Sequence, residues 1–116
     1  MPILVATDSP LALSVDRLEG RWILEFGGRR FAWDEAWLWG DSDGYALFEH
    51  SFRFAPGTAR RVPGSERWVL QRVWVRPELR RQGLLSAVWP TWRNRYGDFH
   101  VTAPSTAMQA FLAAHG

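Results

Sequence analysis

The chain has 116 residues, 47% of them hydrophobic, which suffices for one domain with a single core. It contains no cysteine, which excludes a disulfide framework and any cysteine nucleophile or metal ligand. No apolar run approaches the ~20 residues of a membrane span, and the first residues lack the charged start of a signal peptide. We therefore expect one cytoplasmic domain, residues 1–116, with no membrane partner.

Charge is distributed unevenly along the chain, which the net charge of +2 conceals. Residues 1–50 hold four arginines and nine acids, residues 51–95 hold ten arginines and two acids, and residues 96–116 hold a single acid. No lysine is present, so every cationic side chain is a permanently charged arginine. Guanidinium groups bind phosphate through paired hydrogen bonds, so the basic middle segment suits a nucleotide cofactor or a nucleic acid.

The first third of the chain predicts short antiparallel strands. Residues 11–15 form a candidate strand, and residues 21–33 place two strand-like segments around the pair Gly27-Gly28, which is a hairpin signal. Residues 34–39 are interpreted as a single helical turn capped by the first residue. We therefore predict an N-terminal β-meander without a long helix, in which the tryptophans serve core or dimer contacts.

A longer strand is predicted over residues 45–54, with alternate side chains on opposite faces. His50 falls among phenylalanines on one face, which favours a hydrogen-bonded histidine in or near the core over a catalytic base. Glu49 lies on the other face and is expected to be solvated. Residues 55–65, with two prolines and two glycines, predict a loop. The histidines show no metal-ligand spacing, so we expect no metal site.

The most informative stretch follows. Residues 68–75 are β-branched and aromatic enough for a largely buried strand, and Pro77 ends it. Residues 84–96 predict a helix that Pro90 kinks or divides near its middle. Between strand and helix, residues 80–83 lie where a helix N-terminus presents unpaired N–H groups and a positive dipole end. An anion such as phosphate is favoured at this position.

A second pattern lies near the C-terminus. Residues 99–102 predict a short strand, and Ser105 caps an alanine-rich helix over residues 106–115 that ends on Gly116.

The first of these segments resembles the acetyl-CoA-binding signature of the GNAT superfamily of N-acetyltransferases. That signature is an apolar strand, V-x-P, Arg or Gln, two residues, Gly, one residue, and Gly or Ala. Here Val75 and Pro77 supply V-x-P, Arg80 takes the leading position and Gly83 the required glycine, with Leu85 in the last position.

The second segment is similar to the part of the family that carries an Asn, then a helix with an aromatic pair, then Gly. Ser105 stands at the Asn position, Phe111 and Leu112 at the aromatic pair, and Gly116 at the glycine. The resemblance covers residues 68–116, whereas residues 1–66 show no family signature.

The resemblance implies a compact GNAT-like fold. With the elements predicted above, this gives an α/β (α+β) domain with a mixed, mainly antiparallel sheet, an N-terminal β-meander in place of the family's early helices, and two C-terminal helices. It implies acetyl-CoA as co-substrate and no metal. The residues that would contact acetyl-CoA are the main chain of Val73, Trp74 and Val75, then Arg80, Arg81, Gln82, Gly83, Leu84, Leu85 and Ser86, and Ser105.

The resemblance does not assign the acid and the base of the reaction to particular residues. Many family members carry a carboxylate on the signature strand and a tyrosine on the last helix, where this chain has Gln71, Arg72 and Leu112. Transfer to an amine requires removal of a proton by a base or by water. The candidate bases are Glu49, His50 and Glu66, and the candidates near the departing sulfur are Ser105 and Tyr45.

The implied function is acetyl-CoA-dependent N-acetyl transfer to an unidentified amine on a small molecule or protein. One alternative is a catalytically reduced GNAT-like module that binds CoA or a macromolecular partner. A second alternative is a nucleic-acid-binding protein that uses residues 51–95, although nucleic acid is the less favoured partner. The family usually adds two further strands beside the acceptor site, and we expect a second copy of the chain, in a homodimer, to supply that wall.

Overall fold

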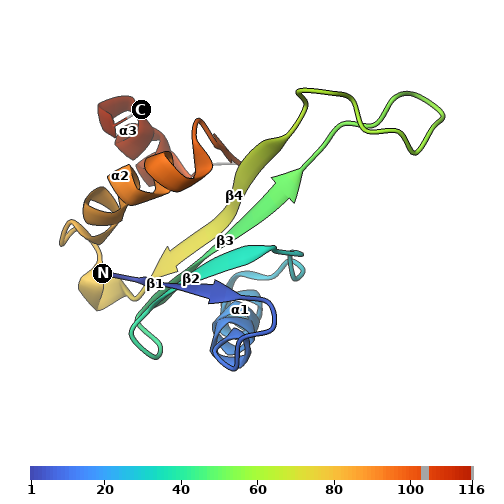
Figure 1. Ribbon diagram of the computed structural model, residues 1–116. Helices are drawn as coiled ribbons and strands as arrows, with labels where there is room; N and C mark the ends of the chain where they lie inside the picture. The colour runs from blue at the N-terminus through green and yellow to red at the C-terminus, as the bar shows by residue number, and fades with distance from the viewer. Residues whose placement is uncertain (103–104, 116) are drawn as a thin grey trace.

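The computed structural model describes residues 1–102 and 105–115 and shows one five-stranded sheet with helices on both faces (Figure 1). The strand order is β1-β2-β3-β4-β5, with β1 to β4 antiparallel and β5 parallel to β4. The elements are β1 (Ile3–Ala6), α1 (Ala12–Phe26), β2 (Glu35–Trp39), β3 (Gly44–Ser51), β4 (Arg67–Val75), the 3₁₀ turn η1 (Pro77–Leu79), α2 (Leu84–Tyr96), β5 (His100–Val101) and α3 (Thr106–His115). The mixed, mainly antiparallel sheet and the two C-terminal helices are confirmed, while the predicted glycine end at Gly116 lies outside the described residues.

Helix α1 replaces the strands predicted over residues 11–15 and 21–26, and residues 27–33 form neither helix nor strand, so those predictions and the absence of a long early helix are wrong. The helix buries Val15, Leu18 and Glu19 at helical spacing against one face of the sheet. Gly27 ends it with a φ of +79°, and its N–H donates to the carbonyl of Ile23 at 2.8 Å. The Gly27-Gly28 pair therefore stops a helix instead of turning a hairpin.

Strand β2 replaces the helical turn predicted over residues 34–39. Its four apolar residues are all buried because both faces of the strand are covered: Trp37 and Trp39 pack toward α2, and Ala36 and Leu38 pack toward α1. Asp34 does not cap a helix, since its carboxylate accepts a 2.7 Å hydrogen bond from the backbone N–H of His50 on β3.

The core on the α2 side of the sheet is built around aromatic rings. Trp92 is fully buried, with the ring centroid of Phe48 5.1 Å away and that of Trp39 5.9 Å away. Helix α2 runs through Pro90 as one element, so the predicted division is wrong. Trp89 before the proline and Trp92 after it are both buried in this core, which holds the two halves in one helix.

Beyond Ser51 and before Arg67, the β3 and β4 chains project past the rest of the sheet as a narrow extension (Figure 1). Among the described residues, no helix has the length and apolarity needed to span a bilayer.

Candidate functional site

Strand β4 carries a bulge at its centre, where its pairing with β3 slips. Leu47 pairs with Arg72, whereas the next residue, Phe48, pairs with Leu70, so Gln71 has no residue opposite. Such bulges bend a strand, redirect its side chains and are common beside active sites.

Strand β5 separates from β4 at the same point. The parallel ladder joins Val69 to His100 and Leu70 to Val101, and then the N–H of Thr102 donates to the carbonyl of Leu70 at 3.1 Å. Among the described residues, no strand pairs with the rest of β4 on this side. The second half of β4 therefore forms an open edge within the layer of the sheet.

Backbone groups of Val73 and Val75 point to this open edge. The carbonyl of Val75 accepts a 2.8 Å hydrogen bond from Nε of Arg80, which lies outside the sheet. Strand residues direct their backbone groups alternately to either side, so Val73 shares the direction of Val75, and Trp74 faces Tyr45 of β3. Of the three main-chain donors predicted from the resemblance, Val73 and Val75 thus face outward.

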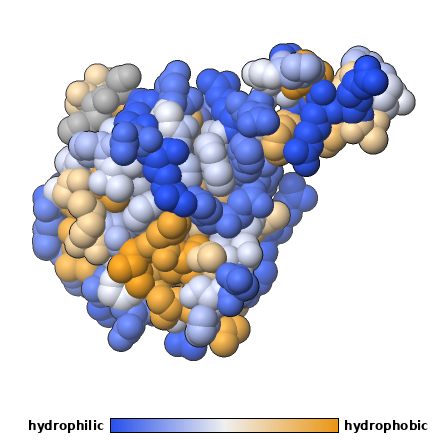
Figure 2. Space-filling view, in the orientation of Figure 1, coloured by the Kyte–Doolittle hydropathy of each residue, from blue (hydrophilic) through white to orange (hydrophobic). Residues whose placement is uncertain are grey.

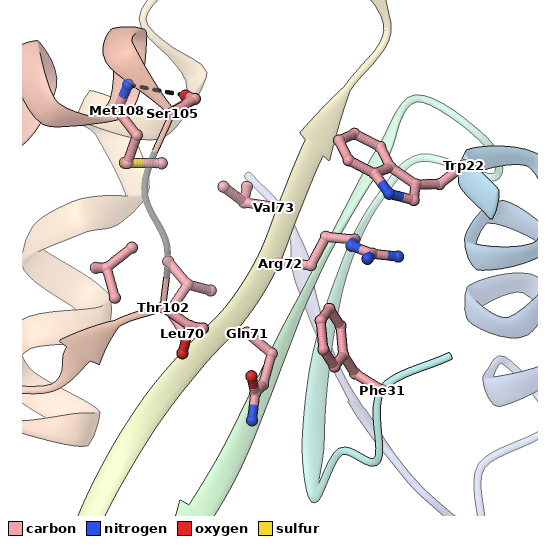
Figure 3. Close-up of a pocket in the computed structure, with 10 residues that line it drawn as sticks. Trp22, Phe31, Leu70, Gln71, Arg72, Val73, Thr102, Ser105 and Met108 are labelled. Atoms are coloured by element: carbon pink, nitrogen blue, oxygen red, sulfur yellow. Dashed lines mark hydrogen bonds between the residues drawn. The ribbon is translucent and has the colours of Figure 1, made fainter. Parts of the chain in front are cut away.

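A cavity of about 310 Å³ occupies the place where β4 and β5 diverge (Figure 3). Gln71 and Arg72 extend from β4 toward the α1 side, where Trp22 and Phe31 lie, while Val73 and Thr102 lie on the other side of the strand. The lining residues come from α1, the segment before β2, β4, β5, and the start of α3: Trp22, Phe31, Leu70, Gln71, Arg72, Val73, Val101, Thr102, Ser105 and Met108.

The loop that follows β4, which was predicted to bind an anion, has two residues in the left-handed backbone conformation. Arg81 is the one non-glycine residue with positive φ in the described chain, at +64°, and Gly83 at the start of α2 has a φ of +79°. Backbone N–H groups in such a loop converge at the positive end of the helix dipole. A Cβ built on Gly83 would meet no described atom within 4 Å, so the space before the helix is open.

The side chains of this loop brace its backbone, face solvent or pack against the core. Arg80 uses Nε to hold Val75, and Gln82 donates from its amide to the carbonyl of Glu78 at 2.9 Å, so both brace the loop. Arg81 is exposed and has no carboxylate within ion-pair distance among the described residues. Leu84 and Leu85 pack against the core, which anchors the first turn of α2.

Two of the predicted bases lie together, away from the cavity. The His50 ring stacks on that of Trp68 with centroids 4.7 Å apart, and its Nε2 lies 3.8 Å from a carboxylate oxygen of Glu66. Both residues line a separate hollow with Tyr96 and Asp98 near the first residue of β4. His50 is half-buried at the edge of the core.

Glu49 lies beside the bulge. Its carboxylate accepts a 3.2 Å hydrogen bond from the side-chain amide of Gln71, which lines the cavity. Glu49 is half-buried, so the prediction of a solvated side chain holds only in part. Of the three predicted bases, Glu49 is the one whose side chain forms a hydrogen bond with a cavity residue among those that the structure describes.

Ser105 caps α3 as predicted. Its hydroxyl accepts a 3.1 Å hydrogen bond from the N–H of Met108, and both residues line the cavity (Figure 3). Tyr45 does not fit the role of acid: it is fully buried on the α1 side, its hydroxyl donates to Glu19, and burial raises its pKa above the ordinary value.

Sequence reasoning missed the ion pair that joins α1 to the bulge. Arg72 and Glu19 are 11% and 4% exposed and bond to each other, and the Arg72 guanidinium also lies 4.8 Å from the Trp22 ring and 4.6 Å from the Phe31 ring. These contacts fix one wall of the cavity. The spacing of Val15, Glu19 and Trp22, four and three residues apart, is typical of one face of a helix and was the signal in the sequence that could have indicated these contacts.

A second network lies on the α2 side. The Tyr96 hydroxyl donates to Glu35 at 2.7 Å and accepts from the indole N–H of Trp37 at 2.7 Å, while Arg95 holds both Glu35 oxygens. The hydrogen bond from Arg95 lowers the pKa of Glu35, and burial raises the pKa of Tyr96. This network ties β2 to the end of α2. Over residues 1–102 and 105–115, no group of three or more histidine or acidic side chains is placed to hold a metal ion.

No protein-family model matches the chain, and no curated protein sequence is significantly similar to it. Solved structures, in contrast, share its fold over nearly its whole length. The xEco2 acetyltransferase domain bound to a CoA conjugate aligns with a TM-score of 0.64 and 16% identity, covering 98% of this chain and 85% of that one.

Two further structures are similar. The AtaT toxin, solved as a mutant with the C-terminus of the antitoxin AtaR and acetyl-CoA, aligns with a TM-score of 0.58 and 14% identity over 100% of this chain and 82% of that one. A Corynebacterium glutamicum protein, described as histone acetyltransferase HPA2 and related acetyltransferase, aligns with a TM-score of 0.54 and 19% identity over 99% and 83%. The chain therefore has the fold of the GNAT acetyltransferases.

Proposed function

We propose that the chain is an acetyl-CoA-dependent N-acetyltransferase that acts on an amine acceptor. The observation that carries this proposal is the separation of β5 from β4 at the bulge, which leaves Val73 without a partner strand beside a cavity. The same strand leads directly into the positive-φ loop before α2. Similar solved structures are named acetyltransferases, and two are named with a CoA conjugate or acetyl-CoA.

The residues of the loop fit the pyrophosphate of the cofactor. Backbone N–H groups of residues 81–86 supply the donors, the open space before Gly83 admits the phosphates, and Arg81 adds an exposed positive charge. Acetyl-CoA would supply the activated acetyl thioester for the reaction. Ser105 borders the cavity from the opposite wall.

Polarisation of the acyl carbonyl is assigned to the backbone of β4. The N–H of Val73 points to the open edge and requires no particular side chain to act as an oxyanion donor. Positioning of the two reactants can by itself supply several kcal/mol of the barrier.

Proton removal from the amine is assigned to Glu49, acting directly or through one water. The carboxylate is held beside the cavity by Gln71, whereas His50 and Glu66 line the separate hollow. A positioned base contributes about 10²–10⁴-fold to the rate. Glu49→Gln should therefore slow transfer by about this factor and remove the rise of the rate with pH, while Glu66→Gln, the matched control, should leave both unchanged.

The second candidate is a GNAT-like module that binds CoA without catalysis. It is favoured by one observation, that Leu112 stands where the family commonly carries a tyrosine acid and packs against the core. Calorimetry with acetyl-CoA measures binding, and thiol release in the presence of a panel of amines measures transfer. Binding without release from any amine would replace the enzyme by the binding module, and absence of binding would refute both.

A further inference from the structure

The extension between β3 and β4, residues 52–66, is an ordered two-stranded ribbon. The N–H of Val62 donates to the carbonyl of Arg53 at 2.9 Å, the N–H of Ala55 donates to the carbonyl of Arg60 at 2.9 Å, and Phe54 is bridged to Arg61. Figure 1 shows the ribbon projecting beyond the rest of the sheet, away from the three helices. Its side chains are therefore presented on a defined backbone and not on a loose loop.

Positive charge gathers on this ribbon. Arg53, Arg60 and Arg61 lie on it and Arg67 lies at its base, all four exposed, whereas Glu66 is its single acid. Hydrophilic residues dominate its surface in the projecting part of the molecule (Figure 2).

These arginines are not neutralised by the fold. None of the four lies within 4 Å of a carboxylate in the part of the chain that the structure describes. In contrast, four arginines of the body, Arg72, Arg76, Arg93 and Arg95, each pair with an acid. The ribbon thus carries several arginine charges that no carboxylate of the described residues pairs with, and an anionic partner could pair with them.

Aromatic rings accompany this charge. The Arg61 guanidinium lies 3.9 Å from the centre of the Phe52 ring, which fixes the arginine on the ribbon. Phe54, directly opposite Arg61, is 57% exposed and has no core role. Arginines beside an exposed ring provide both phosphate contacts and a stacking surface for a base, and a two-stranded ribbon has a width that enters a nucleic-acid groove.

We propose that the ribbon binds nucleic acid, with Arg53, Arg60 and Arg61 on the backbone phosphates and Phe54 against a base. An acidic protein would satisfy the arginines but would leave the exposed ring without a planar partner, so nucleic acid is the better fit. This goes beyond the proposed acetyl transfer and does not depend on it.

The ribbon and the phosphate loop lie at opposite ends of β4. The strand has nine residues, from Arg67 beside the ribbon to Val75 before the loop, so the two sites are about 26 Å apart at about 3.3 Å per residue. Saturating CoA should therefore leave nucleic-acid binding unchanged.

Fluorescence anisotropy of the whole chain with labelled single-stranded RNA and with labelled duplex DNA, each of mixed sequence, tests the proposal. Three phosphate contacts make the affinity fall about 20-fold for a single strand, or about 40-fold for a duplex, between roughly 50 and 200 mM salt. In the triple variant Arg53→Gln/Arg60→Gln/Arg61→Gln, the salt dependence that arises from these three contacts should disappear. Arg53→Gln/Arg60→Gln, which keeps the Arg61–Phe52 contact, should lose about two thirds of the slope.

The matched control is Arg17→Gln/Arg21→Gln/Arg29→Gln, which removes the same charge from exposed positions on and after α1 and should bind like the parent. Circular dichroism and thermal unfolding show that each variant is folded. Absence of binding to either probe, equal loss in the control, or displacement by CoA would overturn the proposal. Equal affinity for a polyglutamate peptide at the same ionic strength would assign the ribbon to an acidic protein instead.

Discussion

Replacing Gly83 by alanine tests the proposed phosphate loop with the smallest change that alters it. Gly83 has a φ of +79°, and a Cβ placed on it meets open space, so the substitution causes no clash in the free protein. The left-handed conformation costs a residue with a Cβ about 1–2 kcal/mol. Each kcal/mol should lower the Tm of a chain of this size by about 3–6 °C.

The effect on CoA is expected to be larger than the effect on stability. The added methyl group would occupy the space that a phosphate needs against the first N–H groups of α2. Loss of one charge-assisted hydrogen bond costs about 1.5–3 kcal/mol, which is roughly 10- to 100-fold in Kd. Calorimetry with CoA measures this directly.

Gly57→Ala is the matched control, because Gly57 has a φ of +72°, also faces open space, and lies on the ribbon far from the loop. It should lose similar stability and keep the parental Kd for CoA. Parental CoA affinity in a folded Gly83→Ala protein would refute the assignment of the loop, and an equal loss in Gly57→Ala would show that binding follows stability alone.

Three further outcomes are expected. Glu19→Gln leaves buried Arg72 without its charge partner and should cost about 3–5 kcal/mol of unfolding free energy, measured by urea denaturation, whereas exposed Glu25→Gln on the same helix should change it by less than about 0.5 kcal/mol. The pKa of Glu35 is lowered in the folded state by the Arg95 hydrogen bond, so its stabilisation is present above the ordinary value of 4.5 and is lost as pH falls through the folded-state value; the difference in Tm between parent and Glu35→Gln should shrink over that range. We also expect a homodimer through the apolar surface that includes exposed Ile3 and Leu4 of edge strand β1, so light scattering should give twice the chain mass and Leu4→Asp should give a monomer, while a parent that is monomeric at tens of micromolar would contradict this.

The second half of the chain could be predicted because its signals are local. The apolar run before Pro77, the Arg80-x-x-Gly83 spacing and the helix after it each depend on neighbours in sequence, and the structure has strand, loop and helix in those places. Ser105 could be assigned as a cap for the same reason.

Helix α1 could not be recognised from the alternation of apolar side chains over residues 11–15, which is typical of a strand. Leu11, Leu13 and Val15 alternate with the smaller Ala12 and Ser14 as in a strand, yet Leu13 is 70% exposed, and only Val15 is buried. Leu24 is 89% exposed as well, so apolar residues on the solvent side blur the helical stripe. Tertiary packing against the sheet, and not local propensity, decides this segment.

The bulge in β4 was not predicted from the sequence, because it depends on contacts with residues that are distant along the chain. Leu70 and Val73 both pack toward α2 although two residues separate them, which a regular strand cannot achieve with a period of two. The extra residue places Gln71 and Arg72 consecutively on the α1 side.

That placement decides what is contacted by the two residues that stand in place of the family's usual carboxylate. Gln71 reaches Glu49 on the neighbouring strand, and Arg72 reaches Glu19 on α1, 53 residues earlier in the chain. Strand β4 has no carboxylate at these two positions, and the carboxylates that contact them belong to β3 and α1. Because both contacts begin at the bulge, the same irregularity that ends the pairing of β4 with β5, where we propose that the cofactor binds, also brings two carboxylates close to β4.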